Sequence, residues 1–193
     1  MVTSIPLTQI SMPGHSAPAA GFEAPFEMLD ACHERVERML KLLARLQQRL
    51  LVRGWDESVA QAAHDVMRYF DLAAPQHHED EERHVFPPLL DKGDDVLVTM
   101  VKKLQVDHRE MERSWVAVRE VLASLTEPPP AGWTRLTPEQ AEVLGHFTGL
   151  YRHHLDDEDG LIYPAARAQM SAEALRVMSG DMMQRRGLEP PAG

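Results

Sequence analysis

The chain has 193 residues, of which 44% are hydrophobic and 26% charged, enough for one domain with a substantial buried core. Its formal net charge of −10 argues against nucleic acid or an anionic membrane surface as partners, because both require a basic surface. A single cysteine, Cys32, excludes an internal disulfide, and no stretch approaches the roughly 20 apolar residues of a membrane span. We therefore expect a cytoplasmic protein.

The first 22 residues are rich in proline and glycine and predict an extended or disordered arm. Four longer segments follow, with hydrophobic residues spaced alternately three and four apart, a pattern typical of helices with one buried face. They extend from Pro25 to Gly54, from Asp56 to Gly93, from Leu97 to Leu125 and onward from Thr137. In the second, we expect Pro75 to kink or break the helix, because proline lacks an N–H and collides with the preceding turn.

Two further signals complete the helical pattern. Thr137-Pro138-Glu139-Gln140 is a capping box with proline at the first helical position, so a helix should begin there. Residues 171–186 predict a short fifth helix, which we expect to cap the bundle or to contact a partner chain in an oligomer. The sequence therefore predicts an all-α antiparallel four-helix bundle over residues 23–170, with an arm at 1–22 and a short C-terminal helix and tail at 171–193.

One short motif occurs twice in the chain. His77, Glu81 and Pro87 align with His154, Glu158 and Pro164, and each pair is 77 residues apart (154 minus 77, for example). Each copy reads His-x3-Glu-x5-Pro with an aromatic residue before the proline. Residues four apart lie on one face of a helix, about 5–6 Å apart at Cβ, so the imidazole and the carboxylate can bind one metal ion. Acidic runs with histidines are often only solvated helix faces, but a second copy makes coincidence a poor explanation.

Each of the four hydrophobic stripes also carries one histidine, namely His33, His77, His108 and His154. A lone histidine on such a face is more often a satisfied core residue than a ligand, but four on four helices favour a shared role. Glu81 and Glu158 lie on the same stripes, and buried carboxylates are costly unless they are paired or bound to metal. No lysine or arginine on the stripes can pair with them, so a metal centre explains all six residues.

The mixture of ligands narrows the choice of metal. Four imidazoles and two carboxylates exceed the ligands of one tetrahedral zinc, and they are too rich in nitrogen for calcium or magnesium. The mixture suits iron or manganese. We expect His33 and His77 at one ion, although the spacing does not determine this pairing. His108 and His154 would then bind a second ion, with the two carboxylates bridging the pair.

Taken together, the motifs resemble those of the hemerythrin-like (HHE cation-binding) domains. The resemblance covers roughly residues 25–167 and rests on a lone histidine on the first and third helices and His-x3-Glu on the second and fourth. It implies a non-haem di-iron centre in a four-helix bundle, with an oxo or hydroxo bridge and with manganese or zinc as possible substitutes. Glu81 and Glu158 would correspond to the family's bridging carboxylates.

The sequence departs from the oxygen carriers of this family in two places. Carriers have His-x3-His on the third helix, where this chain has Glu112 in the second position. Carriers also end with His-x4-Asp, which Asp159 would satisfy, although the internal repeat favours Glu158. Glu112 and, at the matching place on the first helix, Glu37 are therefore further ligand candidates, with a surface or supporting position as the favoured alternative. An acidic ligand in place of an imidazole would favour ferric iron and give a poor reversible carrier.

Four other histidines are expected outside the ligand set. His78 and His153 adjoin ligand candidates but point roughly 100° away from the stripes, so we expect them on the surface or behind the ligands. We expect His64 and His84 on the surface.

Three functions fit this site. The resemblance favours a non-catalytic di-iron protein that binds or senses dioxygen, another small diatomic molecule or peroxide, or that handles iron. The alternative is a di-iron peroxidase or oxidase, although ferritin-like sites use Glu-x-x-His, with the glutamate first. In a third interpretation the bundle holds no metal and the repeat records only ancestry. We expect neither nucleic acid nor a membrane as partner.

Overall fold

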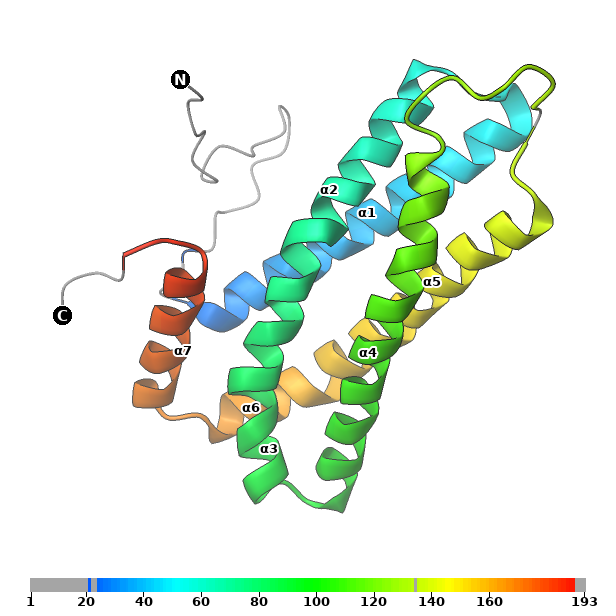
Figure 1. The fold of residues 1–193 in the computed structure, drawn as a ribbon. Coiled ribbons are helices and arrows are strands. Elements are labelled where there is room, and N and C mark those ends of the chain that lie inside the picture. Colours follow the sequence, from blue (N-terminus) through cyan, green and yellow to red (C-terminus); the bar gives the residue numbers. More distant parts are fainter. Residues whose placement is uncertain (1–20, 22–23, 134, 190–193) are drawn as a thin grey trace.

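The computed structural model describes residue 21, residues 24–133 and residues 135–189. All regular elements of these described residues are helices, and the long ones lie side by side as a bundle (Figure 1). This confirms the predicted all-α four-helix bundle. Of the expected N-terminal arm, every residue but Gly21 lies outside the described part of the chain. No helix in the described residues is long and apolar enough to cross a membrane.

The bundle consists of four long helices, α1 (Pro25–Arg53), α2 (Glu57–Asp80), α4 (Asp95–Ala123) and α5 (Pro138–Asp157). Two π-helical turns continue the second and fourth of these, η2 (Glu81–Val85) and η3 (Glu158–Ile162). Each π turn leads directly into a short helix, α3 (Phe86–Lys92) or α6 (Tyr163–Gln169). A last helix, α7 (Ala172–Arg185), lies beside α2 in Figure 1.

The helix ends follow the predicted signals. Gly54 ends α1 with φ of 78°, in the left-handed region that glycine adopts without strain. Thr137 and Gln140 form the predicted capping box, in which the Gln140 N–H donates to Thr137 Oγ1 (3.2 Å) and the Thr137 N–H donates to Gln140 Oε1 (2.9 Å). The predicted fifth helix is α7, which begins after Ser171 as its N-cap.

Of the kink or break expected at Pro75, the break is wrong, because α2 continues through it to Asp80, and the kink stays a prediction. Irregular backbone lies at the two π turns, each followed by an aromatic residue and a proline. In a regular helix the ring of Pro87 or Pro164 would collide with the carbonyl four residues earlier, and a wider turn relieves that collision. The chain therefore stays helical through Pro87 and Pro88, and the helix ends at Gly93.

The core divides into two hydrophobic clusters along the bundle. One contains the apolar side chains on the α1–α2 loop side, including Leu43, Phe70 and Phe147. The other lies toward α3, α6 and α7, and it includes Phe86 and Met178. On each long helix the polar ligand candidates lie between the two clusters, so the bundle encloses them from both ends.

Helix α7 packs on its own chain, which is one of the two expected arrangements. Met178 and Met182 have no exposed surface and belong to the second hydrophobic cluster. Asp80, at the end of α2 and fully buried, accepts hydrogen bonds from Arg185 and from Arg186, whose Nη2 lies 2.7 Å from Asp80 Oδ2. Ion pairs and methionine packing therefore fasten α7 to the end of α2 next to Glu81.

His84, which we expected on the surface, is instead partly buried beside α7. Its Nε2 lies 2.8 Å from Asp181 Oδ2, and Arg185 Nε donates to the same oxygen at 2.8 Å. The exposed fraction of the His84 side chain is 15%.

Replacing Asp80 by alanine should destabilise the metal-free protein by about 3–5 kcal/mol, because two partly buried guanidinium groups lose their carboxylate. Chemical denaturation measures the free energy of unfolding. Asp156→Ala, which removes an exposed carboxylate from the second copy of the motif, is the control and should change it by less than about 0.5 kcal/mol. A change below about 1 kcal/mol for Asp80→Ala would show that the ion pairs of Asp80 with Arg185 and Arg186 contribute little to stability.

Candidate metal centre

The structure brings the six main ligand candidates together in the middle of the bundle. None of them is more than 4% exposed. They come from four helices and the first residues of the two π turns, and they are His33, His77, Glu81, His108, His154 and Glu158. A π turn places an extra residue in one helical turn and is often found at functional sites. Here each π turn begins at the glutamate of a His-x3-Glu motif.

The four histidines form two pairs whose Nε2 atoms point at each other. His33 Nε2 lies 3.0 Å from His77 Nε2. His108 Nε2 lies 3.1 Å from His154 Nε2. Two nitrogens bound about 2.1 Å from one metal ion and at right angles would lie about 3.0 Å apart, so either pair has the spacing of two ligands on one ion.

Each glutamate spans both histidine pairs. Glu81 places Oε1 3.5 Å from His77 Nε2 and Oε2 3.5 Å from His108 Nε2. Glu158 places Oε2 3.3 Å from His33 Nε2 and Oε1 3.0 Å from His154 Nε2. Each carboxylate therefore turns one oxygen toward each pair, which is the arrangement of a group that bridges two cations.

The lone histidine of each half is oriented by an acid from the other half. His33 Nδ1 donates to Asp159 Oδ1 at 2.8 Å, and His108 Nδ1 donates to Glu82 Oε1 at 3.1 Å. The two acids occupy equivalent positions in the repeat, one residue after each glutamate of the site. With Nδ1 protonated, the lone pair of Nε2 is directed into the cluster, as in carboxylate–histidine–metal arrangements.

The aromatic residues that end the two motifs support the same histidines. Tyr163 stacks on His33 with ring centroids 4.9 Å apart, and Phe86 stacks on His108 at 5.5 Å. The Tyr163 hydroxyl also donates to Glu81 Oε1 at 2.5 Å and lies 3.0 Å from His33 Nε2. Phe86 has no hydroxyl, so the two ends of the cluster differ in polarity.

Two of the imidazoles are strongly basic without a metal. Burial opposes their charged form, but contacts with the carboxylates of Asp159 and Glu158 outweigh it and raise the pKa of His33 to about 10. For His108 the carboxylates of Glu81 and Glu82 do the same, and the pKa again rises to about 10. Burial lowers the pKa of His77 to about 3, so that ring stays neutral.

The buried carboxylates have few hydrogen-bond donors for their oxygens. No hydrogen bond reaches Glu158 Oε1, Glu158 Oε2 or Glu81 Oε2. A buried carboxylate without hydrogen bonds is costly, and cations between the histidine pairs would remove that cost. Among these six side chains, two sets have the spacing to hold a metal ion, His33 with His77, Glu81 and Glu158, and Glu81 with His108, His154 and Glu158. The residues present therefore fit a metal centre.

The three additional ligand candidates lie outside the cluster. Glu37 and Glu112 are exposed, and Glu37 accepts a hydrogen bond from Lys41 at 2.6 Å. Asp159 is 55% exposed in its side chain and contacts the outer nitrogen of His33. The structure therefore places Glu37 and Glu112 on the surface and Asp159 behind a candidate ligand.

His78 lies behind a candidate ligand, which is one of its two expected places. His78, expected on the surface or behind the ligands, is only 5% exposed and stacks on His108 with ring centroids 4.1 Å apart. A signal for its burial was available, because the equivalent residue of the second copy is the hydrophobic Leu155. His153 is exposed, in agreement with the expectation, and so is His64.

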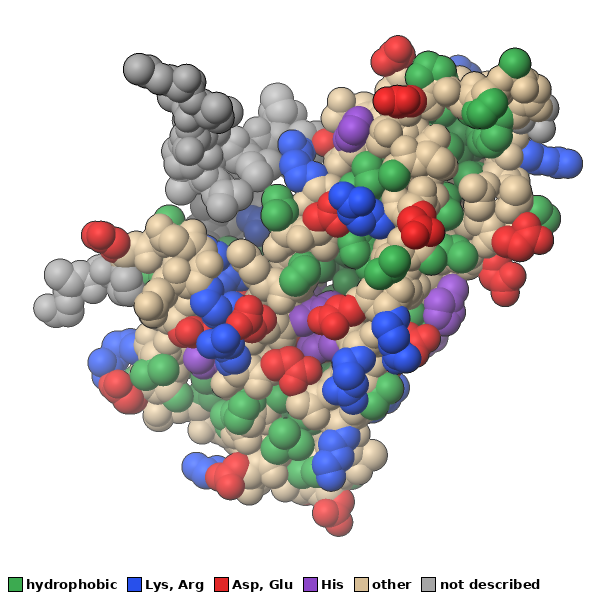
Figure 2. Space-filling model, viewed as in Figure 1, with side chains coloured by type: hydrophobic (Ala, Val, Ile, Leu, Met, Phe, Trp, Pro, Cys, Tyr) green, Lys and Arg blue, Asp and Glu red, His purple; other side chains and the backbone are tan. Residues whose placement is uncertain are grey.

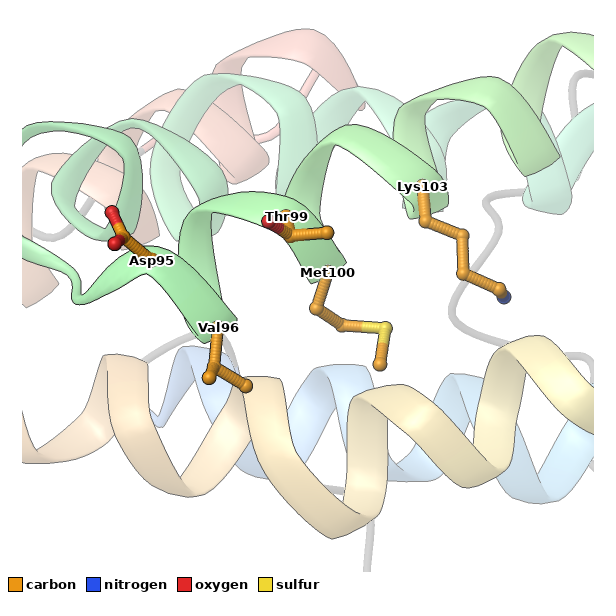
Figure 3. Close-up of a pocket in the computed structure, with 5 residues that line it drawn as sticks. All are labelled: Asp95, Val96, Thr99, Met100 and Lys103. Atoms are coloured by element: carbon orange, nitrogen blue, oxygen red, sulfur yellow. The ribbon is translucent and has the colours of Figure 1, made fainter.

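A surface groove of about 430 Å³ lies elsewhere, along the beginning of α4 (Figure 3). It contains none of the ligand candidates and is lined by Asp95, Val96, Thr99, Met100 and Lys103. The histidine and glutamate cluster, and not this groove, is therefore the candidate functional site.

Two comparisons with known proteins bear on this cluster. The family model described as hemerythrin HHE cation binding domain matches residues 24–166, which include every ligand candidate. The chain is also 29% identical to an uncharacterized protein of Haemophilus influenzae over 171 residues, which cover 86% of this chain and 92% of the relative. With its bundle and its buried cluster of histidines and glutamates able to hold metal, the chain belongs to the hemerythrin HHE cation-binding domain family.

Proposed function

We propose that the protein holds two iron ions in this cluster and uses them to bind a small ligand, in the first place dioxygen, as a binding or sensing protein. One observation carries the proposal, namely that Glu81 and Glu158 each direct one oxygen to each histidine pair. A single ion would leave one end of both carboxylates unused. Two ions, one per pair, use all four oxygens.

The donor set supports iron. Each histidine pair has one oxygen from each of the two glutamates beside it. Two imidazoles with a carboxylate form a ligand set typical of non-haem iron sites that keep open positions. Iron held there would supply reversible one-electron chemistry and free coordination positions for a small ligand. Manganese or zinc would fit the same donors as substitutes.

Burial supports a small ligand. The six clustered residues are at most 4% exposed, so a substrate of metabolite size has no direct contact with them. Figure 2 shows histidine side chains between α2 and α4 on this face of the molecule, with acidic side chains beside them. A diatomic molecule or peroxide is small enough to reach the cluster between these helices.

Around the proposed ions, the protein's own residues have separate tasks. Asp159 and Glu82 hold the outer nitrogens of the lone histidines, which keeps both Nε2 lone pairs directed inward. The Tyr163 hydroxyl holds a proton within 2.5 Å of Glu81 Oε1, at the His33 end of the cluster. To donate to a ligand that gains negative charge at this end, the hydroxyl would have to turn from Glu81 toward that ligand.

The expectation that this protein is a poor reversible carrier loses its main support. It rested on an acidic ligand in place of an imidazole, with Glu112 as the candidate, and Glu112 is exposed. The donors that remain are neutral imidazoles and the two shared carboxylates, so we propose dioxygen binding without that restriction.

The test begins with protein produced under iron-replete conditions and analysed for iron and for magnetic coupling by Mössbauer spectroscopy. The proposal expects about two iron ions per chain in one coupled pair. Dioxygen is then added to the anaerobic reduced protein and removed under vacuum. Reversible spectral change supports binding, whereas sustained peroxide turnover would support the peroxidase alternative. Less than about one iron per chain would support a metal-free bundle.

Glu158→Gln should lower the iron content from about two to below one per chain, because a bridging carboxylate loses its charge at both ions. Glu112→Gln is the matched control, since Glu112 also follows a cluster histidine by four residues but is exposed. It should bind as much iron as the wild type. Equal iron content in both variants would contradict the assignment of Glu158.

Metal uptake near neutral pH should release protons, about two per chain. His33 and His108 have a pKa of about 10 and are protonated without metal, whereas a metal ion binds only the neutral ring. Apparent affinity should therefore rise as the pH increases from neutral toward 10. Calorimetric titration in buffers of different ionisation enthalpy counts the protons, and binding without proton release would contradict this electrostatic account.

A further inference from the structure

His78 is a buried histidine that is not among the six proposed metal ligands. It is 5% exposed, and neither Nδ1 nor Nε2 has a hydrogen-bond partner. A neutral imidazole carries one donor and one acceptor, and burying both without partners is unfavourable. Such a residue in the core calls for a ligand that the protein itself does not provide.

The second half of the chain shows what packing alone requires at this position. The residue equivalent to His78 is Leu155, which is 6% exposed and belongs to a hydrophobic cluster. A leucine therefore fills this place on the helix without any polar cost. The nitrogens of His78 are not explained by packing.

The ring of His78 lies at one end of the metal cluster. It stacks on His108 with centroids 4.1 Å apart and planes inclined by 11°, and its centroid is 6.1 Å from that of His154. One ring nitrogen from each of the three histidines lies within 4.8 Å of the other two. Three imidazoles thus present nitrogens to one region, which is a ligand set typical of zinc, copper, iron or nickel.

The opposite end of the cluster is built differently. There the Tyr163 hydroxyl lies 3.0 Å from His33 Nε2 and donates to Glu81. Two of the differences between the copies therefore lie at the ends of the cluster, a histidine for a leucine at one end and a tyrosine for a phenylalanine at the other. The two ends do not offer equivalent environments to the two ions.

We propose that His78 is a further metal ligand, which binds the same ion as His108 and His154. This inference rests on the proposed two-ion centre and makes its two ions unequal. One ion has three imidazoles, and the other has two imidazoles and a neighbouring tyrosine hydroxyl. The ion at the three-imidazole end is held more tightly.

His78→Leu tests the proposal, because it installs the residue that the second copy already uses. The metal-free variant should fold and be at least as thermostable as the wild type, since two unpartnered nitrogens are removed. Its binding of one of two Co²⁺ ions, measured by competition with a chelator, should weaken by about 10-fold or more, while the other ion binds nearly as before. His153→Leu, an exposed histidine that also adjoins a ligand candidate, is the matched control and should bind both ions with wild-type affinity.

A second measurement needs no variant. In the Co²⁺-loaded wild type, each bound imidazole contributes one exchangeable N–H proton with a large paramagnetic shift in the NMR spectrum. With His78 bound, five such signals are expected from the cluster. Four signals would overturn the proposal, as would wild-type affinity for both ions in His78→Leu.

The outcomes keep the two proposals apart. If the wild type binds two ions and His78→Leu also binds both unchanged, the two-ion centre stands and the role of His78 fails. If the wild type binds no metal ion in the cluster, both proposals fail together.

Discussion

The structure depends on two carboxylates buried among four imidazoles. Glu81 and Glu158 have no exposed surface, and three of their four oxygens receive no hydrogen bond. Burial of such groups opposes folding unless positive charge lies close to them. In the protein alone that charge comes from protonated His33 and His108, and in the proposed holoprotein it comes from two cations. The same six residues thus explain both the tolerance of the polar core and the affinity for metal.

The internal repeat arranges this core as two interlocked halves. Each half supplies a lone histidine, a His-x3-Glu motif, a π turn and an aromatic residue before proline. The acid that follows each glutamate holds the lone histidine of the other half, Asp159 on His33 and Glu82 on His108. Neither half therefore completes its own site, and the centre exists only when the two helix pairs meet. At the edge of this arrangement, Asp80 connects the metal-binding end of α2 to the arginines of α7.

Much of this arrangement could be predicted from the sequence, because it depends on residues that are close along the chain. Hydrophobic spacing identified the long helices, and the capping box at Thr137 and Gln140 identified the start of α5. The repeat identified four of the six clustered residues, and the lone histidines on the hydrophobic stripes of the first and third helices added His33 and His108. Features that depend on residues far apart in the chain could not be predicted. The crosswise contacts of Asp159 and Glu82, and the pairing of Asp80 with α7, join residues that no local pattern relates.

Two features of the site have signals in the comparison of the two copies of the repeat. The burial of His78 is indicated by Leu155 at the equivalent position, whereas the helical angle alone allowed a place on the surface or behind the ligands. A kink or break was expected at Pro75, and the helix does not break there. The π-helical backbone occurs before Pro87 and Pro164, where the aromatic-proline ending appears in both copies. Glu112 was a candidate only through comparison with oxygen carriers, and its side chain is exposed although it lies one turn after the buried His108 on α4.

The most direct test of the central claim is the position of the bound ions. Crystals of the iron-loaded protein, measured at the iron absorption edge, should give two anomalous peaks about 3.5–4 Å apart, one beside the His33–His77 pair and one beside the His108–His154 pair. A single peak that leaves either histidine pair empty, or no peak within the cluster, would contradict a two-ion centre bridged by Glu81 and Glu158.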